Sequence, residues 1–180
     1  MKLNLGSGND YRKGYVNVDR VKMPKVDFVH DLNDLPLPFK DNSAEEIRLI
    51  HVLEHLKKQS LKKFFDELYR ICKPNGLIFI EVPYFFSAYS VIDLEHENFF
   101  VWDTLFQYCS EELHSYYHSK AKFEIVERKF GMLSNVPVWR ELLPFFANAF
   151  PRFYERFFAR IFPCDVIKYV LRPKKVRGKK

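Results

Sequence analysis

Apolar residues fall along this chain in two alternating patterns. Short continuous runs rich in Val, Ile and Leu, bounded by Gly, Pro or Asp, predict strands. These runs lie at residues 2–6, 15–19, 26–30, 46–50, 77–82, 123–130 and 165–171. A longer segment at 60–72 repeats its apolar residues at helical spacing with charged residues opposite. It predicts a helix that is ended by the Pro-Asn-Gly turn at 74–76.

The order of these elements predicts the fold class. Residues 77–80 are apolar on both faces, as in a buried parallel strand. Strand–helix–strand alternation is typical of a Rossmann-like α/β sheet, mostly parallel, with its ligand at the carboxyl ends of the strands. We expect 165–171 to return as an antiparallel last strand beside 123–130. One domain is expected over 1–172, with an aromatic helical insertion at about 137–163 and a disordered basic tail at 173–180.

The first strand runs into a glycine turn, Leu5-Gly6-Ser7-Gly8. Glycine permits a sharp turn and lets the backbone approach a ligand without a Cβ in the way, although many ordinary tight turns also contain it. Asp19 and Asp31 follow the next two strands. An acid at such a strand end can accept hydrogen bonds from both hydroxyls of a ribose. The three strand ends therefore predict a cofactor site at one edge of the sheet.

A family resemblance rests on five segments that occur in a set order. They are LNLGSG (3–8), VNVDR (16–20), DFVHDLNDLPLPF (27–39), EEIRLIHVLEHL (45–56) and, after a helix, KPNGLIFIEVP (73–83). Over residues 2–83 the chain resembles the class I S-adenosylmethionine (SAM) dependent methyltransferases of the type 11 domain group. Within that group it is most similar to small methyltransferases often associated with surface-polysaccharide genes.

The resemblance implies SAM as cofactor, S-adenosylhomocysteine as product, and a small-molecule or glycan-type methyl acceptor. It also implies roles for nine residues, carried over by position. Leu5, Gly6, Ser7 and Gly8 would cradle the methionine end of SAM, Asp19 would hold the ribose with Arg20 beside the adenine, Asp31 and Leu32 would read the adenine, and His51 would close the site.

Two features depart from the family pattern. Asn4 stands where the first strand usually carries an acid, which weakens any carboxylate contact to the amino group of SAM. Only residues 7–14 separate the first two strands, whereas a parallel crossover normally needs a dozen or more. We therefore expect a compacted first crossover with one helical turn at most. A nicotinamide cofactor is disfavoured, because its fingerprint requires GxGxxG opening a full helix.

The segment from His51 to His55 reads HxxEH, which is also the signature of inverted zinc peptidases. Histidines four residues apart on a helix can bind one metal ion, but a peptidase needs a third protein ligand, and the sequence identifies none. The motif also follows a strand directly within the SAM-like series. We therefore expect no metal, a cofactor-lining His51, and a His55 hydrogen-bonded inside the fold.

The segment at 93–100 resembles the family's DxxHxxxF motif and follows the fifth strand. If the methyl acceptor is a hydroxyl, a base must take its proton, and histidine titrates in the useful range. His96 is the candidate base, with Asp93 as the residue that orients it. The alternative is that His96 only fixes the loop and that alignment of the substrates drives the reaction.

Residues 139–162 are rich in Phe, and Arg152, Arg156 and Arg160 recur every four residues. This pattern fits a helix at a membrane interface, with the polybasic tail as a second attachment signal. Two alternatives stay open: the aromatic residues cover the sheet or the acceptor pocket, or they form a homodimer contact. Pro144, Pro151 and Pro163 divide the stretch into short helices.

Charge and cysteine content limit the functional classes. The formal net charge is +6, and six positive charges fall in the last nine residues, so the remainder is formally neutral. Nucleic-acid surfaces usually spread basic residues along a face, so an RNA methyltransferase is disfavoured. Three widely spaced Cys without a CxxC pair, no signal-peptide pattern and no long apolar run favour the cytoplasm. A membrane-peripheral, non-catalytic SAM-binding module is the remaining alternative.

Overall fold

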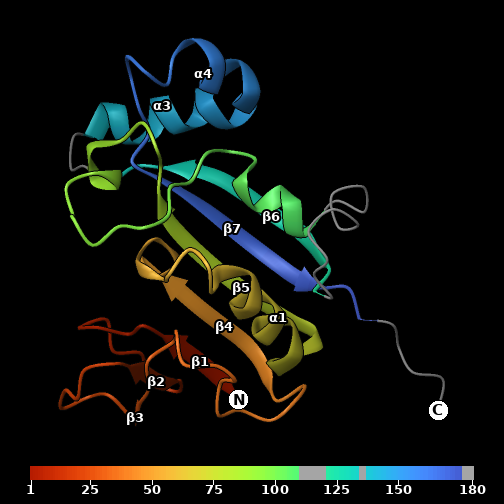
Figure 1. Ribbon diagram of the computed structural model, residues 1–180. Helices are drawn as coiled ribbons and strands as arrows, with labels where there is room; N and C mark the ends of the chain where they lie inside the picture. The colour runs from red at the N-terminus through yellow and green to blue at the C-terminus, as the bar shows by residue number, and fades with distance from the viewer. Residues whose placement is uncertain (110–120, 134–136, 176–180) are drawn as a thin grey trace.

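The computed structural model describes residues 1–109, 121–133 and 137–175, and for 137–140 the backbone alone. Seven strands form one sheet in the order β3-β2-β1-β4-β5-β7-β6 (Figure 1). Their bounds are Lys2–Leu5 (β1), Val16–Asp19 (β2), Phe28–Val29 (β3), Ala44–Ile50 (β4), Cys72–Pro83 (β5), Phe123–Gly131 (β6) and Val166–Pro173 (β7). Strands β1 to β5 pair in parallel, and β7 pairs antiparallel with both β5 and β6. Both the Rossmann-like sheet and its antiparallel last strand are confirmed.

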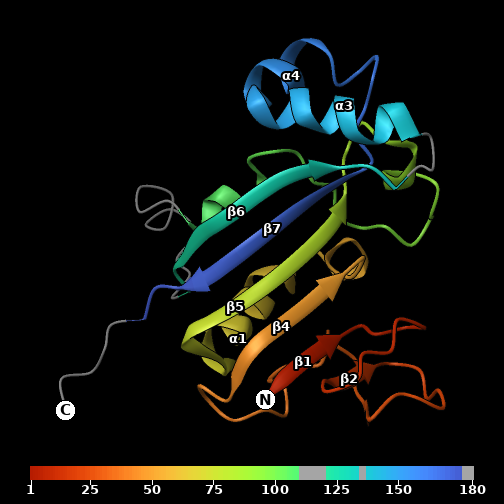
Figure 2. The ribbon, with the colours of Figure 1, turned by 180° about the vertical axis from the view of Figure 1, so that it is seen from behind.

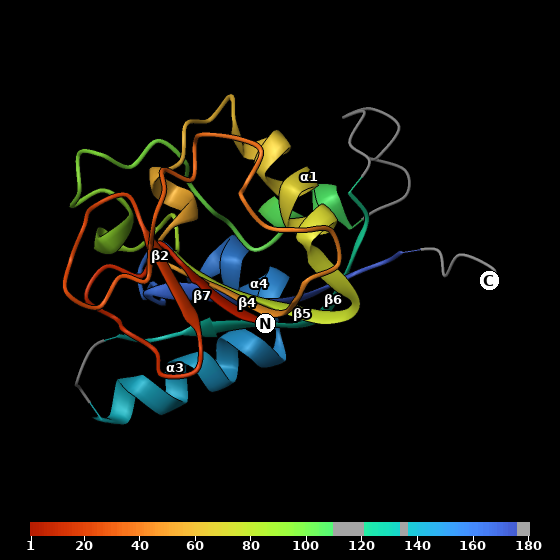
Figure 3. The same ribbon diagram turned by 90° about the horizontal axis from the view of Figure 1, so that it is seen from below.

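One face of the sheet is covered by α1 (Leu61–Ile71), which confirms the predicted helix. Its residues Phe64, Phe65 and Leu68 are fully buried against the apolar side of the strands. Figure 3 shows the sheet edge-on, with α1 on one side and α3 (Pro137–Ala149) on the other. From behind, no described helix lies over β1, β4 or β5 (Figure 2).

The expected Pro-Asn-Gly turn after this helix is wrong. Strand β5 begins at Cys72, directly after α1, and residues 74–76 lie within it. The pairing with β4 is irregular there, between Ala44 and Glu46, which accommodates the proline. A Cβ on Gly76 would lie 2.6 Å from Cys72 Sγ and 3.1 Å from the Ala44 carbonyl oxygen. The glycine therefore allows the strands to approach closely, instead of ending the helix.

The short connection between β1 and β2, all of which is described, contains turns and no helix, as expected. Two paired asparagines hold it in place. The Asn4 side-chain amide donates to the Asp10 carbonyl and to Asn17 Oδ1 (2.8 and 3.0 Å). Asn17 also exchanges hydrogen bonds with the backbone of Arg12. The amide of Asn4 therefore serves the loop, which explains the departure from the family's usual acid at this position.

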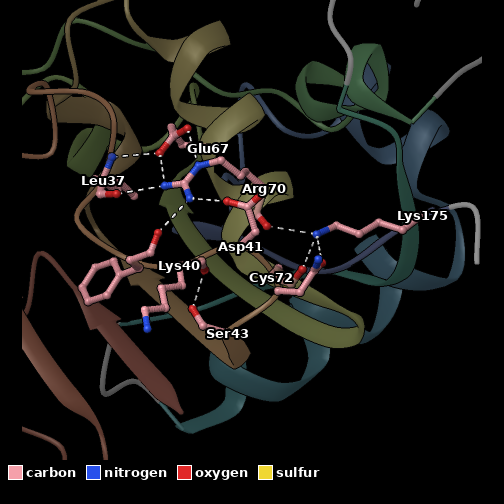
Figure 4. A network of polar contacts seen from close by, with 10 residues as sticks. Leu37, Lys40, Asp41, Ser43, Glu67, Arg70, Cys72 and Lys175 are labelled. Carbon is pink, nitrogen blue, oxygen red and sulfur yellow. Dashed lines mark hydrogen bonds and ion pairs between the residues drawn. The ribbon is translucent and has the colours of Figure 1, made fainter. Parts of the chain in front are cut away.

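The connection from β3 to β4 is fixed by α1 through Arg70 (Figure 4). The Arg70 guanidinium donates to the carbonyl oxygens of Leu37 and Phe39, to Asp41 and to both oxygens of Glu67. Glu67 in turn accepts from the Leu37 N–H at 2.8 Å. A planar guanidinium satisfies five acceptors at once, which a lysine ammonium cannot do.

The α3–α4 segment joins the end of β6 to the start of β7. In α4 (Pro151–Phe157), the buried Tyr154 hydroxyl donates to the Phe162 carbonyl and accepts from the Cys164 N–H. In α3, Asn148 exchanges two hydrogen bonds with the backbone of Phe130. Several large apolar side chains of the segment are nevertheless more than half exposed: Leu142, Phe145, Phe150, Phe157 and Ile161. The segment therefore covers the sheet with one side only.

The basic tail starts far from this segment. Strand β7 leads away from α4 (Figure 1). At about 3.3 Å per residue, Lys174 lies about 26 Å from Val166, the first residue of the strand. Lys175 Nζ donates to the carbonyl oxygens of Arg70 and Cys72. Residues 176–180 of the predicted tail lie outside the described residues. In the part of the chain that is described, no helix is both long and apolar enough to cross a membrane.

Candidate cofactor and acceptor site

A cavity of about 270 Å³ opens where the carboxyl ends of β1, β2 and β4 meet the loop after β3. Its volume is close to the lower end of the range for small-molecule sites, about 300 Å³. The cavity is lined by Gly6, Gly8, Asp19, Arg20, His30, Asp31, Leu32, Asn33, His51, Val52, His55, Leu56 and Glu95. Seven of the nine residues expected at the cofactor line it. Leu5 and Ser7 do not line it, and both side chains are buried.

Gly6 forms the floor of this cavity and has no room for a side chain. Its φ of 64° is in the left-handed region, and a Cβ there would lie 2.5 Å from Val52 Cγ2. Gly8 also has a positive φ, 47°, but nothing lies within 4 Å of its Cβ position. Gly6 is therefore required both by conformation and by space, and Gly8 by conformation only.

Asp19 is held at the end of β2 by backbone donors. Its Oδ2 accepts from the Gly8 N–H and its Oδ1 from the Val21 N–H, at 2.8 and 2.9 Å. Two carboxylate oxygens offer about four lone-pair positions. The carboxylate is therefore oriented and still has acceptor capacity for two ligand hydroxyls.

The loop after β3 forms a third wall of the cavity. Asp31 Oδ1 accepts from both the N–H and the side-chain amide of Asn33. Asn33 Oδ1 accepts from the Lys57 N–H, which ties this wall to the loop after β4. Leu32 contributes an apolar surface and is itself 7% exposed.

His51 follows β4 in a strained conformation, with φ at 55°. Its Nδ1 lies 3.2 Å from Glu54 Oε1, and its Nε2 lies 3.3 Å from Glu81 Oε1. The two carboxylates raise the pKa of His51 to about 9. The His51 and Lys168 contacts lower the pKa of Glu81 to about 2. A protonated imidazolium bridging two carboxylates fixes one side of the cavity.

The loop after β5 is latched onto the 3₁₀ turn η1 (Leu53–His55) by a residue that the sequence did not single out. The buried side-chain amide of Asn98 donates to the carbonyl oxygens of Leu53 and Leu56. The N–H groups of Glu97 and Asn98 both donate to the Glu54 carbonyl oxygen. This latch brings Glu95 to the cavity and places the His96 ring against His55, which lines it. Asn98 lies within the segment 93–100 that resembles the DxxHxxxF motif, and this is the one signal that could have identified it.

The structure changes the expected surroundings of His96 and His55. His96 Nδ1 lies 2.9 Å from the Ser90 carbonyl oxygen, so this carbonyl orients the ring. The Asp93 carboxylate, expected to orient it, accepts from the Glu95 N–H instead. His55 lines the cavity, and in the described part of the chain no hydrogen bond to its ring is found. Its expected hydrogen-bonded interior position is therefore wrong.

Arg20 and Glu95 join two walls of the cavity. Arg20 Nη2 lies 3.3 Å from Glu95 Oε2, and both side chains are well exposed. Such an exposed pair contributes little to stability, about 0–1 kcal/mol. Its position connects the end of β2 to the loop that carries His96.

Comparison with known proteins agrees with this arrangement. The methyltransferase domain family matches residues 7–80, which include the carboxyl ends of β2, β3 and β4. No curated protein matches the sequence. Similar solved structures include a SAM dependent methyltransferase from Archaeoglobus fulgidus, with 18% identity and a TM-score of 0.53 over 88% of this chain and 75% of that one.

Two further structures share the fold over 96% of this chain. One is a putative methyltransferase from Haloferax volcanii in complex with the Trm112 activator, with 17% identity, a TM-score of 0.57 and 82% of that chain covered. The other is the 1,6-didemethyltoxoflavin-N1-methyltransferase of Burkholderia thailandensis with bound S-adenosylhomocysteine, with 13% identity, a TM-score of 0.56 and 70% covered. The chain therefore matches the methyltransferase domain family over residues 7–80 and shares its overall fold with these methyltransferase structures.

Proposed function

We propose that the cavity at the strand ends holds SAM and that the chain methylates a small-molecule or glycan-type acceptor. The observation that carries the proposal is the convergence of Gly6, Asp19, Asp31 and His51 on one cavity. The oriented carboxylate of Asp19 suits a ribose, and the left-handed turn at Gly6 gives a backbone surface without a Cβ for the methionine end. Asp31 and Leu32 offer an acceptor and an apolar surface to the adenine, and Arg20 lies beside them.

The chemistry asks little of the protein beyond alignment. Bound SAM supplies an electrophilic methyl group, whose bond to sulfur breaks as the bond to the acceptor forms, the electron pair staying on sulfur. The chain's own residues then place the acceptor in line and exclude water. We propose that the acceptor approaches from the side of His55 and Glu95, where the loop after β5 meets the cavity.

His96 is the proposed aid to an acceptor that must lose a proton. A carbonyl oxygen can only accept a hydrogen bond, so His96 Nδ1 carries the proton that it shares with Ser90. Nε2 is then the nitrogen with a free lone pair. Holding that tautomer is a positioning role for the Ser90 carbonyl.

Titration calorimetry with SAM and with S-adenosylhomocysteine tests the cofactor site. We expect micromolar binding by the wild-type chain and a loss of at least about 100-fold in Asp19→Ala, since two oriented acceptors are removed. Asp10→Ala is the matched control, because Asp10 is an exposed acid outside the cavity whose carboxylate, within the described residues, accepts from Arg12 alone. Equal binding by wild type and Asp19→Ala would refute the assignment.

We further propose that the exposed side of α3 and α4 binds an anionic membrane surface. Phe145 and Phe157 are 76% and 57% exposed, and Arg152, Arg156 and Arg160 lie among the apolar residues as exposed cations. Apolar side chains surrounded by arginines are complementary to anionic headgroups above acyl chains. The segment lies between the end of β6 and the start of β7, at the same edge of the sheet as the cofactor cavity.

Two contacts join this membrane-facing segment to the acceptor side of the molecule. The Tyr84 hydroxyl donates to Glu155, and the Arg160 guanidinium lies 5.6 Å from the centre of the Phe86 ring. An acceptor carried by a membrane would therefore reach the chain at the cofactor edge. The described part of the basic tail, residues 174 and 175, follows the end of β7 that is far from α4. The membrane proposal therefore does not depend on the tail.

Sedimentation with phosphatidylcholine vesicles containing increasing phosphatidylserine tests this second proposal. We expect binding that rises with phosphatidylserine and falls in Phe153→Ser/Phe157→Ser, whereas the control Val126→Ser, an exposed residue of β6, should bind normally. Size-exclusion chromatography of the same proteins examines the alternative occupant. A wild-type dimer that the double variant converts to a monomer, with no vesicle binding, would replace the membrane proposal by a homodimer contact.

A further inference from the structure

Three side chains that the methyl-transfer proposal leaves partly unused meet beside the cofactor cavity. Glu54 and His55 come from the turn after β4, and His96 comes from the loop after β5. One ligand atom from each lies within 4.8 Å of the other two. Two imidazoles and one carboxylate are a common ligand set for a divalent transition-metal ion.

The Glu54 carboxylate is the strongest sign that something is bound there. Glu54 is 1% exposed, and its Oε1 is used by His51 Nδ1. Its Oε2 is buried and, among the described residues, has no hydrogen-bond partner. An unpartnered buried carboxylate oxygen is costly, because it loses its water without gaining a donor or a cation.

Both imidazoles have a nitrogen available for a metal. His96 uses its Nδ1–H on the Ser90 carbonyl oxygen, which leaves the Nε2 lone pair free. A backbone carbonyl in that position is the usual outer partner of a metal-binding histidine, since it fixes the tautomer and the ring. The His55 ring lies edge-on to the His96 ring, with centroids 4.6 Å apart.

The backbone around the three residues is already fixed in place. Asn98 and Glu97 bond to the carbonyl oxygens of Leu53, Glu54 and Leu56, so the loop that carries His96 is tied to the turn that carries Glu54 and His55. Ligands on two tied segments lose little freedom when they bind a cation. Metal–ligand distances of about 2.0–2.2 Å require ligand atoms roughly 3–3.5 Å apart, which small side-chain rotations provide.

We propose that Glu54 Oε2, His55 and His96 Nε2 bind one divalent transition-metal cation, such as Zn²⁺. This set differs from the inverted zinc-peptidase arrangement read from HxxEH, because His51 is taken up by Glu54 and Glu81. The third ligand that the sequence did not identify is His96, which lies 41 positions after His55. The expectation that the chain holds no metal is replaced by this proposal.

A cation at this position would favour one class of methyl acceptor, and this conclusion rests on the proposed function. His55 lines the cofactor cavity, so a cation held by it would lie beside the proposed methyl donor. An alcohol, phenol or diol whose oxygen binds the cation releases its proton to water more easily. The bound oxygen would then form the new bond to the methyl carbon as the bond from that carbon to sulfur breaks, with the electron pair staying on sulfur. With a cation bound, His96 Nε2 would be a ligand, and the cation would replace His96 in the proton-removing role proposed above.

The test measures metal binding directly, on untagged full-length protein stripped with a chelator. Calorimetry with ZnCl2, and visible absorption with CoCl2, should show one cation per chain. Glu54→Gln and His96→Ala should each weaken binding at least about 100-fold. His30→Ala is the matched control, because it removes an imidazole that lines the same cavity outside the ligand set. Thermal unfolding of the stripped proteins confirms that each variant folds.

Each result bears on a different claim. No stoichiometric cation in the wild type, or unchanged affinity in both Glu54→Gln and His96→Ala, overturns the metal site. If His30→Ala weakens binding as much as His96→Ala does, the assigned ligands are wrong. Calorimetry with SAM on the stripped protein separates the two proposals. If the protein binds SAM but no cation, only the metal-site inference fails. If it binds a cation but not SAM, only the cofactor assignment fails.

Discussion

The loops that follow β1, β2 and β3, at the edge of the sheet with the cofactor cavity, differ from the α3–α4 segment in what stabilises them. The connections after β1, β2 and β3 lack regular helices within the described residues and are held by polar side chains bonded to backbone, as Asn17 and Arg70 show. The α3–α4 segment is helical and aromatic, is anchored by a few buried groups such as Tyr154, and exposes much of its apolar surface.

Each region suits the contact that we propose for it. A short loop that surrounds a polar ligand cannot rely on apolar burial, so hydrogen bonds to fixed backbone groups must define its shape. A helix with apolar residues on both sides can pack against the protein core with one side and bind a membrane or another apolar surface with the other. In α3–α4, different residues should therefore determine stability and binding. In the loops that line the cofactor cavity, the same residues should determine both.

The largest expected effect tests this separation within α4. Tyr154→Ala removes a fully buried ring and leaves the Cys164 N–H without its acceptor, so the free energy of unfolding should fall by about 3–5 kcal/mol. Phe157→Ala, three residues away and 57% exposed, should change it by less than about 0.5 kcal/mol. Urea unfolding measures both. A comparable loss in the two variants would mean that the exposed face is not free.

A pair of glycine variants sharpens the comparison at the cofactor edge. Gly6→Ala should lose about 1–2 kcal/mol from its left-handed φ and a further amount of order 1–3 kcal/mol from the contact with Val52. Gly8→Ala should lose only the first part, because its Cβ position is open. Val52→Ala in the Gly6→Ala background should recover part of the contact cost. Equal losses for the two single variants in chemical unfolding would contradict the geometry.

The smallest effect is a pH dependence centred on His51. Its pKa is raised from 6.5 to about 9 by Glu54 and Glu81, so its contribution to stability is complete below about pH 6.5 and disappears as the pH rises to about 9. The pKa of Glu81 is lowered from 4.5 to about 2, so its contribution is complete above about pH 4.5 and is lost as the pH falls to about 2. Melting temperature should therefore decline from pH 6.5 to 9 in the wild type and less steeply in His51→Asn. Parallel slopes would show that His51 does not carry the effect.

Much of the fold could be read from the chain because its signals are local. Continuous apolar runs, a helix of regular period and the series of strand-end residues Gly6, Asp19 and His51 placed the sheet and most of the cavity lining. The Pro-Asn-Gly segment misled, because a glycine that permits close strand packing looks the same in sequence as one that ends a helix. The side chains of Leu5 and Ser7 are buried and do not line the cavity, so their expected cofactor roles stay a prediction.

The residues that were missed or misplaced depend on contacts between distant segments. Asn98 and the Ser90 carbonyl act on groups that only the folded loop brings near. Asp93 was a reasonable orienting residue for His96 by spacing, but its carboxylate is satisfied locally by the Glu95 N–H. Hydrogen bonds between residues far apart in the sequence leave no periodic pattern from which they could be predicted.

By itself, the amino-acid order determined the strand and helix pattern, the glycine turn and the order of acidic strand ends, because these follow from the chemistry of adjacent residues. Only the tertiary structure decided that Glu54, His55 and His96 lie close together, and that the aromatic residues of α3 and α4 are divided between core and surface. Convergence and exposure depend on which segments pack together, and that is fixed when the whole sheet and its loops form.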